Sequence, residues 1–283
     1  MGDKQVWLVT GASRGLGLDI ARSALKAGHK VIAGYRSKAK TAAFDEIEAL
    51  GGTWLQLEMA GDDVESQVQS VIASHGKIDV LINNAGWIML GSLEDTDLDR
   101  VNSIFKTNFL GPLRTIKAVL PSMRARRSGT IVNISSSSIL EIYPGLGIYG
   151  ATKFALDGIT EALHAEVAEL NIRALLVIPG SLDTEARDTT GAGVHIPLNE
   201  GYKGTTLEKV EQMLLSPDIL TTATKPAPVA QRIVEAVDRT GIFAGKEIGH
   251  ILPLGKDTSV SLEKRATFYQ NLVKDTKEVC ESV

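Results

Sequence analysis

The chain has 283 residues and a formal net charge of −4 at pH 7, with 43% hydrophobic and 23% charged residues. This composition is typical of a globular protein, and its acidic balance argues against a nucleic-acid-binding protein, which would carry a basic excess. The single cysteine excludes a disulfide framework and a cysteine-based zinc site, and we expect no metal. We see no targeting segment and no apolar run near the roughly 20 residues of a membrane span, so we expect a cytoplasmic protein.

Short β-branched runs alternate with amphipathic stretches over most of the chain. The expected strands are residues 6–10, 30–34, 53–57, 79–83, 129–135 and 172–178, and the expected helices are 16–27, 38–50, 64–74, 98–127 and 149–170. Repeated β-α-β units predict a parallel sheet with helices on both faces, and the almost wholly apolar strands agree with that arrangement. We expect an α/β fold, a doubly wound parallel sheet in a single domain over residues 1–283.

The regular alternation stops after Pro179. Residues 181–225 are rich in glycine and contain only short helical patterns. An irregular segment of this length inside a compact domain is usually functional, so we expect a lid that closes over a ligand. The alternation resumes with a helix at 229–238, a strand at 248–252 and a C-terminal helix at about 260–281.

A glycine-rich loop, Thr10-Gly-Ala-Ser-Arg-Gly-Leu-Gly17, joins the first expected strand to the first expected helix. Its glycines permit a tight turn and let a diphosphate approach bare backbone. The following helix offers free N–H groups and the positive end of its dipole. The position of the loop therefore predicts a Rossmann-type fold that binds a dinucleotide, and a tight turn without any ligand is the alternative.

The end of the second expected strand, Tyr35-Arg36-Ser37, carries no carboxylate. An acidic side chain there would bind the ribose 2′-hydroxyl of NAD, whereas an arginine suits the 2′-phosphate of NADP. Arg14 in the glycine loop can reach the same phosphate, and two guanidinium groups can bind one dianion. The pattern predicts NADP(H), although each arginine taken alone could be a solvated surface charge.

Tyr149 and Lys153 lie four residues apart on an expected helix and so project from one face. A nearby cation lowers the pKa of a tyrosine from its reference value near 10, toward the range that a general acid or base needs. Ser136 can donate a hydrogen bond to a substrate oxygen as charge develops on it, with Ser138 as a minor rival.

These motifs together resemble the short-chain dehydrogenase/reductase family over residues 5–180. The resemblance rests on the glycine loop, Asn83-Asn-Ala-Gly86, Asn108, the spacing of Ser136 thirteen residues before Tyr149, the Y-x-x-x-K signature and Pro179-Gly180. It implies reduction of a carbonyl by NADPH or the reverse alcohol oxidation, with Tyr149 as general acid or base. It also implies that Lys153 binds the nicotinamide ribose, and that Asn108 kinks its helix and holds a water leading to solvent.

The loop, the strand end and the resemblance together give the expected site. The expected catalytic residues are Asn108, Ser136, Tyr149 and Lys153. The expected cofactor-binding residues are Gly11, Ser13, Arg14, Gly15, Leu16, Gly17, Tyr35, Arg36, Ser37, Glu58, Met59, Asn84, Ala85, Gly86, Tyr149, Lys153, Pro179, Gly180 and Thr184.

The surroundings of this site are mostly apolar. Trp87, Ile88, Met89, Tyr143, Leu146 and Ile148 favour a hydrophobic ketone, aldehyde or alcohol as substrate, and we interpret His195 as a solvated loop histidine. The tail that begins Leu252-Pro-Leu-Gly255 resembles that of hydroxysteroid- and retinol-type members of the family. This tail weakens the inference to the tetramer of shorter members, and the family resemblance implies self-association through the helices at 98–127 and 149–170, as a homodimer first and a tetramer as the alternative.

Two other functional classes stay open. One is a biosynthetic cyclase or isomerase in which NADPH is incidental. The other is a regulator that senses NADP without turnover, although such proteins tend to lose one member of the tyrosine–lysine pair. The sequence does not determine the substrate, the direction or the stereochemistry of the reaction.

Overall fold

The computed structural model describes residues 4–37, 41–184, 193–216, 218, 221 and 223–283. The expected helix start at 38–40 and residues 185–192 of the expected lid lie outside the described residues. Across the described residues, no helix combines the length and the apolar character that crossing a membrane would require.

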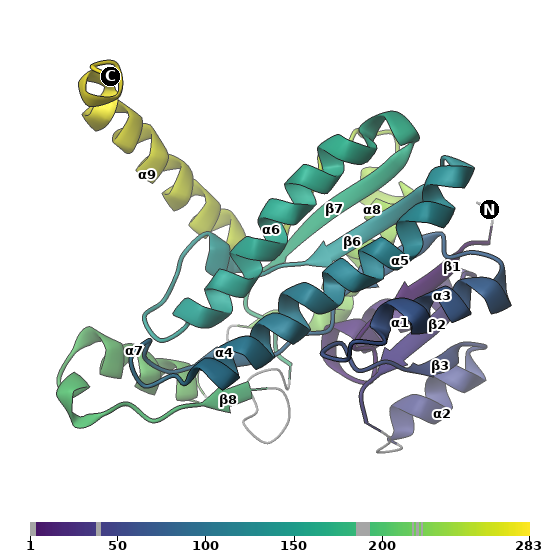
Figure 1. Cartoon of the computed structure of the whole chain (residues 1–283), viewed down its shortest axis with the longest axis horizontal. Helices are drawn as coiled ribbons and strands as arrows, with labels where there is room; N and C mark the ends of the chain where they lie inside the picture. The colour runs from purple at the N-terminus through teal and green to yellow at the C-terminus, as the bar shows by residue number, and fades with distance from the viewer. Residues whose placement is uncertain (1–3, 38–40, 185–192, 217, 219–220, 222) are drawn as a thin grey trace.

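A parallel sheet of seven strands forms the centre of the molecule, in the order β3-β2-β1-β4-β6-β7-β9 (Figure 1). Its strands are β1 (Val6–Val9), β2 (Lys30–Tyr35), β3 (Thr53–Gln56), β4 (Val80–Asn83), β6 (Gly129–Ile134), β7 (Ile172–Pro179) and β9 (Ile251–Leu254). The order reverses direction between β1 and β4. In open α/β sheets, a ligand binds outside the carboxyl ends of the strands at such a switch point.

Helices cover both faces of the sheet. They are α1 (Gly15–Lys26), α2 (Ala42–Ala49), α3 (Val64–His75), α4 (Leu98–Phe105), α5 (Gly111–Arg126), α6 (Gly147–Val167), α7 (Thr206–Leu215), α8 (Pro226–Asp238) and α9 (Lys256–Cys280). Successive residues of β1 point to opposite faces, as strand geometry requires. Trp7 and Val9 join a core with α1 and α8, whereas Val6 and Leu8 join a second core with α3, α5 and α6. The expected α/β fold, with a doubly wound Rossmann-type sheet in a single domain, is confirmed.

The helix expected over residues 98–127 is not continuous. A π-helical turn, Lys106–Leu110, separates α4 from α5 and contains the fully buried Asn108. Gly111 follows the turn at a close crossing, where a Cβ atom would lie 2.7 Å from the carbonyl oxygen of Met59. Single π-turns inside helices often occur at functional sites.

The last part of the chain differs from the expected boundaries. The strand expected at 248–252 is β9 at Ile251–Leu254, and α9 begins at Lys256 rather than near residue 260. Ile248 packs against the core without pairing in the sheet, so its apolar character suggested a strand start that is wrong. The register with β7 decides the strand, since it pairs Leu176 with Ile251. The C-terminal part of α9 leaves the body and points outward (Figure 1).

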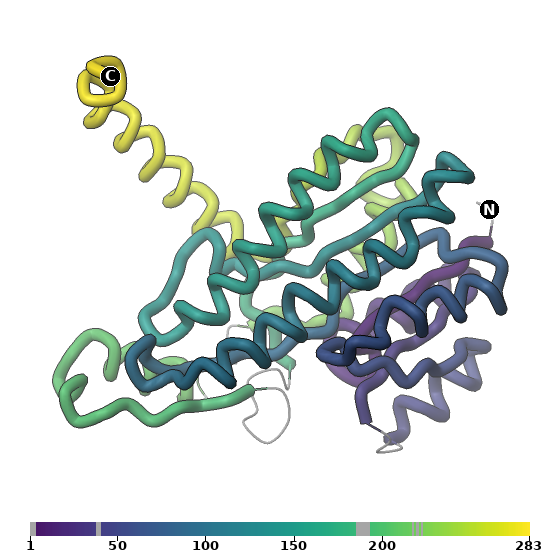
Figure 2. Tube along the Cα trace, in the orientation of Figure 1, coloured from purple at the N-terminus to yellow at the C-terminus, as the bar shows by residue number. Residues whose placement is uncertain are grey.

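The expected lid contains regular structure. Strand β8 (Gly193–His195) pairs in parallel with β5 (Ile88–Leu90), and α7 follows. Hydrogen bonds tie this segment to the loop before α4: the Asn199 amide donates to Asp95 over 2.8 Å, and the Tyr202 hydroxyl donates to Glu94 over 2.8 Å. Figure 2 shows the segment after β8 looping out beyond α4.

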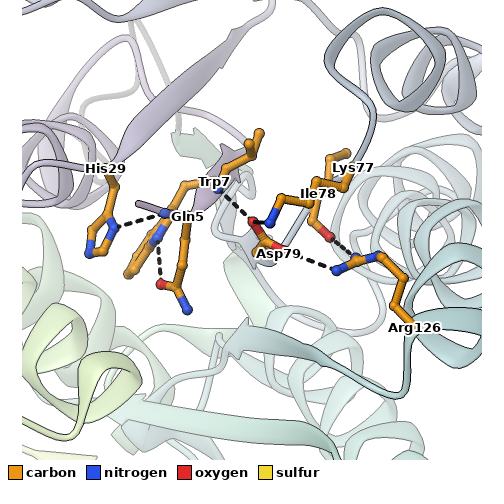
Figure 3. A network of polar contacts seen from close by, with 8 residues as sticks. Gln5, Trp7, His29, Lys77, Ile78, Asp79 and Arg126 are labelled. Atoms are coloured by element: carbon orange, nitrogen blue, oxygen red, sulfur yellow. Dashed lines mark hydrogen bonds and ion pairs between the residues drawn. The ribbon is translucent and has the colours of Figure 1, made fainter. Parts of the chain in front are cut away.

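A polar network closes the amino-terminal edge of the sheet, opposite the expected site (Figure 3). The Asp79 carboxylate accepts a hydrogen bond from the Val6 amide over 2.9 Å and forms ion pairs with Arg126 over 3.0 Å and Lys77 over 3.1 Å. Arg126 also donates to the carbonyl oxygen of Ile78 over 2.9 Å. Asp79 thus joins β1, β4 and the end of α5.

Candidate active site

A cavity of about 1040 Å³ opens at the carboxyl ends of the central strands. Most of the expected site residues line it: Gly11, Ser13, Arg14, Gly15, Leu16, Arg36, Ser37, Glu58, Met59, Asn84, Ala85, Gly86, Ser136, Tyr149, Lys153, Pro179, Gly180 and Thr184. Gly17, Tyr35 and Asn108 are not among its lining residues.

The glycine loop has a shape that side chains would prevent. Gly11 has a φ of +64°, and a Cβ atom on it would lie 2.8 Å from the Cα of Ala85. A Cβ atom on Gly17 would lie 2.3 Å from the carbonyl oxygen of Gly11, which explains the glycine at 17 by close packing. Helix α1 then begins at Gly15 without a side-chain cap, so its first N–H groups remain available to an anion. This cradle fits a dinucleotide diphosphate.

Asn84 holds the glycine loop against the end of β4. Its side-chain amide donates to the carbonyl oxygens of Thr10 over 3.0 Å and Gly11 over 3.1 Å. The Thr10 hydroxyl in turn accepts hydrogen bonds from the backbone of Asn84 and Ala85, each over 3.0 Å. The side chain of Asn84 therefore shapes the cradle from within.

The end of β2 presents one charged side chain to the cavity and turns another side chain away. Arg36 lines the cavity with its side chain 61% exposed, and it lies 3.9 Å from Glu58. Exposed ion pairs of this kind contribute little stability, so Arg36 can turn to a phosphate at small cost. The ring of Tyr35 packs edge-on against Phe44 and Trp54, with centroid distances of 5.1 and 5.9 Å.

Helix α6 places Tyr149 and Lys153 on the cavity wall, both almost fully buried. The Lys153 ammonium lies 5.9 Å from the centre of the Tyr149 ring and donates a hydrogen bond to the carbonyl oxygen of Ile134 over 2.8 Å. Burial lowers the pKa of Lys153 to about 8, because desolvation disfavours the charged form. The side chain is still largely protonated at neutral pH, so a cation faces the tyrosine.

The serines that follow β6 form one short turn that also lines the cavity. The hydroxyl of Ser136 accepts a hydrogen bond from the Ser138 amide over 3.1 Å and lies 3.1 Å from the Ser138 hydroxyl. Both serines line the cavity. Ser135 also reaches the lining, and its buried hydroxyl has no partner among the described residues. The turn thus presents the Ser136 hydroxyl to the cavity that Tyr149 also lines, and the Ser138 hydroxyl orients it.

Asn108 lies behind the cavity wall, where the π-helical turn directs it inward. Its amide donates to the carbonyl oxygen of Trp87 over 3.0 Å and to the Thr152 hydroxyl over 3.2 Å, and its oxygen accepts from the Trp87 amide over 3.1 Å. A Cβ atom on Gly86 would lie 3.1 Å from the Asn108 oxygen and 3.7 Å from the Lys153 nitrogen. Gly86 therefore keeps the space between Asn108 and Lys153 open.

The substrate side of the cavity is mostly apolar. Of the expected pocket residues, Trp87, Ile88, Tyr143 and Leu146 line it, while Met89 and Ile148 pack in a cluster with Tyr149. The lining residues that the motifs did not identify include Glu141, Val194, His195, Met213, Leu214, Leu215, Asp257 and Ser261. The run Met213-Leu-Leu215 was a detectable signal, since an apolar run inside an irregular polar segment needs something to cover.

The first turn of α9 completes the site beside Gly180. Asp257 accepts a hydrogen bond from the Ser181 amide over 2.6 Å, and a Cβ atom on Gly180 would lie 2.0 Å from its carboxylate. Gly180 is therefore required for the C-terminal helix to dock on the loop after β7. The sequence predicted the helix but not this contact, because no motif marks it.

Known proteins are similar to this chain in sequence and in structure. The model of the family described as short chain dehydrogenase matches residues 5–194. Oxidoreductase claN of Passalora fulva is 43% identical over 208 residues, which are 73% of this chain and 94% of that protein. Retinol dehydrogenase 8 of Homo sapiens is 35% identical over 243 residues, 82% of this chain and 78% of that protein.

Solved structures agree with this assignment. A short-chain dehydrogenase from Streptomyces avermitilis superposes with a TM-score of 0.86 at 30% identity, covering 100% of this chain and 99% of that one. Actinorhodin polyketide ketoreductase, solved with NADPH, gives a TM-score of 0.72 at 27% identity, covering 89% and 95%. On its motifs, its fold and these relatives, the chain belongs to the short-chain dehydrogenase family and is an oxidoreductase.

Proposed function

We propose that this oxidoreductase uses NADPH to interconvert a ketone or aldehyde with the corresponding alcohol on a hydrophobic small molecule. The observation that carries the proposal is that Tyr149, Lys153 and Ser136 line the same cavity as the glycine loop. The apolar lining opposite them supports a hydrophobic substrate.

The residues that line the cavity fit the cofactor. The glycine loop and the uncapped start of α1 would hold the diphosphate, and Arg14 with Arg36 would bind the 2′-phosphate. Pro179, Gly180 and Thr184 also line the cavity, and they would hold the nicotinamide carboxamide and the diphosphate. Bound NADPH would supply the hydride that reduces the carbonyl carbon. Relatives of this fold solved with NADPH or NADP support the choice of cofactor.

The side chains of the chain itself would handle the proton. Tyr149 donates its hydroxyl proton to the carbonyl oxygen as that oxygen gains charge, and Ser136 donates a hydrogen bond to the same oxygen. The Lys153 ammonium, held by Ile134, stabilises the phenolate that remains. The open space at Gly86, between Lys153 and Asn108, would admit a water that returns the proton.

Turnover with a panel of apolar ketones and aldehydes tests the proposal, with NADPH oxidation as the readout. Tyr149→Phe should retain the fold and the affinity for NADPH but lose the proton donor. Since general acid catalysis contributes about 10²–10⁴-fold, kcat should fall by at least about a hundredfold with KM little changed. A Tyr149→Phe protein with the wild-type rate would contradict the proposal and favour a cyclase or a regulator instead.

We also propose a homodimer formed through α4, α5 and α6, as the family resemblance implies. Size-exclusion chromatography with light scattering measures the mass in solution. A monomer at micromolar concentration would contradict this part of the proposal, and a tetramer would extend it.

A further inference from the structure

The expected lid carries a histidine that hydrogen-bonds to a carboxylate at the edge of the cavity. Nε2 of His195 on β8 lies 2.7 Å from Oε1 of Glu211 on α7, and the two side chains are 25% and 14% exposed. His195 lines the cavity, and Glu211 is not among the lining residues. The histidine therefore stands between the carboxylate and the cavity, and it is not the solvated loop residue that the sequence suggested.

Strand geometry explains why His195 faces the cavity. In the parallel pairing of β5 with β8, Gly193 lies opposite Ile88 and His195 lies opposite Leu90. Alternate residues of a strand share a face, so these four positions belong to one surface. All four line the cavity, as does Val194 between the two β8 positions, and Met89 and Ile88 pack in the cluster with Tyr149.

The same small sheet connects His195 to the catalytic group. Ile196, the next residue, packs in the cluster that contains Tyr149, and its amide donates to the carbonyl oxygen of Leu90 over 2.8 Å. His195 is therefore held on the substrate side, at a fixed place relative to Tyr149.

The pairing with Glu211 decides which atom of the ring is available. A carboxylate only accepts hydrogen bonds, so the Nε2 atom of His195 carries the hydrogen that points to Glu211. In the neutral ring the other nitrogen, Nδ1, then has a lone pair and acts as an acceptor. Among the described residues, no partner is recorded for Nδ1.

We propose that His195 is a specificity-determining residue, whose Nδ1 accepts a hydrogen bond from a hydroxyl group on the substrate, remote from the reacting carbonyl. Glu211 is the positioning residue that orients the ring. The preferred substrate is thus an apolar hydroxy-ketone or diol rather than a plain hydrocarbon ketone. This inference rests on the proposed carbonyl–alcohol reaction and narrows its substrate class.

Two substitutions separate this role from a purely structural latch between β8 and α7. In His195→Asn, the side-chain oxygen can replace Nδ1, but the contact with Glu211 is lost. In His195→Gln, the amide nitrogen can replace Nε2 and keep that contact, but no acceptor remains at the Nδ1 position. The structure also offers a matched control, His29→Gln, because His29 pairs with Asp238 over 3.0 Å and is not among the lining residues of the cavity.

The probes are 2-alkanones of increasing chain length and the matching ω-hydroxy-2-alkanones. At one chain length, wild type should prefer the hydroxy-ketone by about tenfold or more in kcat/KM, since a site that hydrogen-bonds a substrate hydroxyl discriminates against the analogue that lacks it. His195→Asn and the His29→Gln control should retain most of this preference, and His195→Gln should lose it while reducing the plain ketones normally.

Calorimetric binding of the same compounds to the protein saturated with NADP⁺ gives a readout independent of turnover. If no ketone is reduced, the proposed function fails, and the binding preference still tests His195. An equal preference in wild type and His195→Gln would overturn the inference. Loss of the preference in His195→Asn but not in His195→Gln would also overturn it, because a purely structural contact between β8 and α7 predicts that pattern.

Discussion

The buried charge of Lys153 should lower the free energy of unfolding of the cofactor-free protein at neutral pH, and Lys153→Met measures by how much. The side chain is 5% exposed, and its ammonium has a single hydrogen bond among the described residues, 2.8 Å to the carbonyl oxygen of Ile134. Burial lowers its pKa from 10.5 to about 8. Because one pKa unit corresponds to about 1.4 kcal/mol, keeping the buried side chain charged costs the folded protein about 3 kcal/mol.

The pH dependence of this cost has a definite sign. Below about pH 8 the lysine is protonated in both the folded and the unfolded protein, so the full cost is present. Between about pH 8 and 10.5 the folded protein releases the proton first, so the unfolded state binds more protons and stability rises with pH. Above that window both states are neutral and the cost is gone.

Methionine has a similar length and no charge, so Lys153→Met removes the titration together with one hydrogen bond of about 1 kcal/mol. The variant should therefore be more stable than wild type by about 2 kcal/mol at neutral pH. This advantage should shrink by about 3 kcal/mol, and so reverse, as the pH rises through the window.

Urea unfolding followed by tryptophan fluorescence measures the two free energies of unfolding across this pH range, using the three native tryptophans. Lys117→Met is a suitable control, because it makes the same replacement at a side chain that is 61% exposed. A wild-type-to-variant difference that stays constant from pH 8 to pH 10.5 would refute the reasoning that desolvation governs Lys153.

Two other substitutions test the cofactor site and the polar network at the amino-terminal edge of the sheet. Arg36→Asp should weaken NADPH binding by about 2–4 kcal/mol, since it removes a charge-assisted contact and adds repulsion. Fluorescence titration measures this loss of affinity, and equal wild-type affinities for NADH and NADPH would contradict the assigned role of Arg36. Asp79→Asn should lower the free energy of unfolding by about 2 kcal/mol, because Arg126 and Lys77 lose their counter-charge, with unchanged kcat. Denaturation and steady-state assays check the two halves of that expectation, and an unchanged stability would show that the network in Figure 3 contributes nothing.

The features that the sequence determined by itself depend on local chemistry. The strands of the first 180 residues are recognisable because a sheet covered on both faces requires nearly continuous apolar runs. The glycine loop is recognisable because positive φ at Gly11 and close packing at Gly17 tolerate no side chain. Tyr149 and Lys153 share a helix, so their spacing alone places them on one face.

Other features depend on contacts between residues far apart in the chain, and only the tertiary structure decided them. The ring of Tyr35 turns away from the cavity because Phe44 and Trp54 offer it an aromatic cluster. The resemblance implied a kink at Asn108, but only the structure shows that Trp87 and Thr152 satisfy its amide there.

The lid shows the same limit most clearly. His195 had no local signal, since its role depends on a strand partner more than a hundred positions away and on Glu211 in a later helix. The lowered pKa of Lys153 likewise arises from burial beneath several elements, which no spacing of residue types records. Local sequence specifies backbone conformation, while burial and long-range pairing decide which side chains reach the cavity and in which charge state.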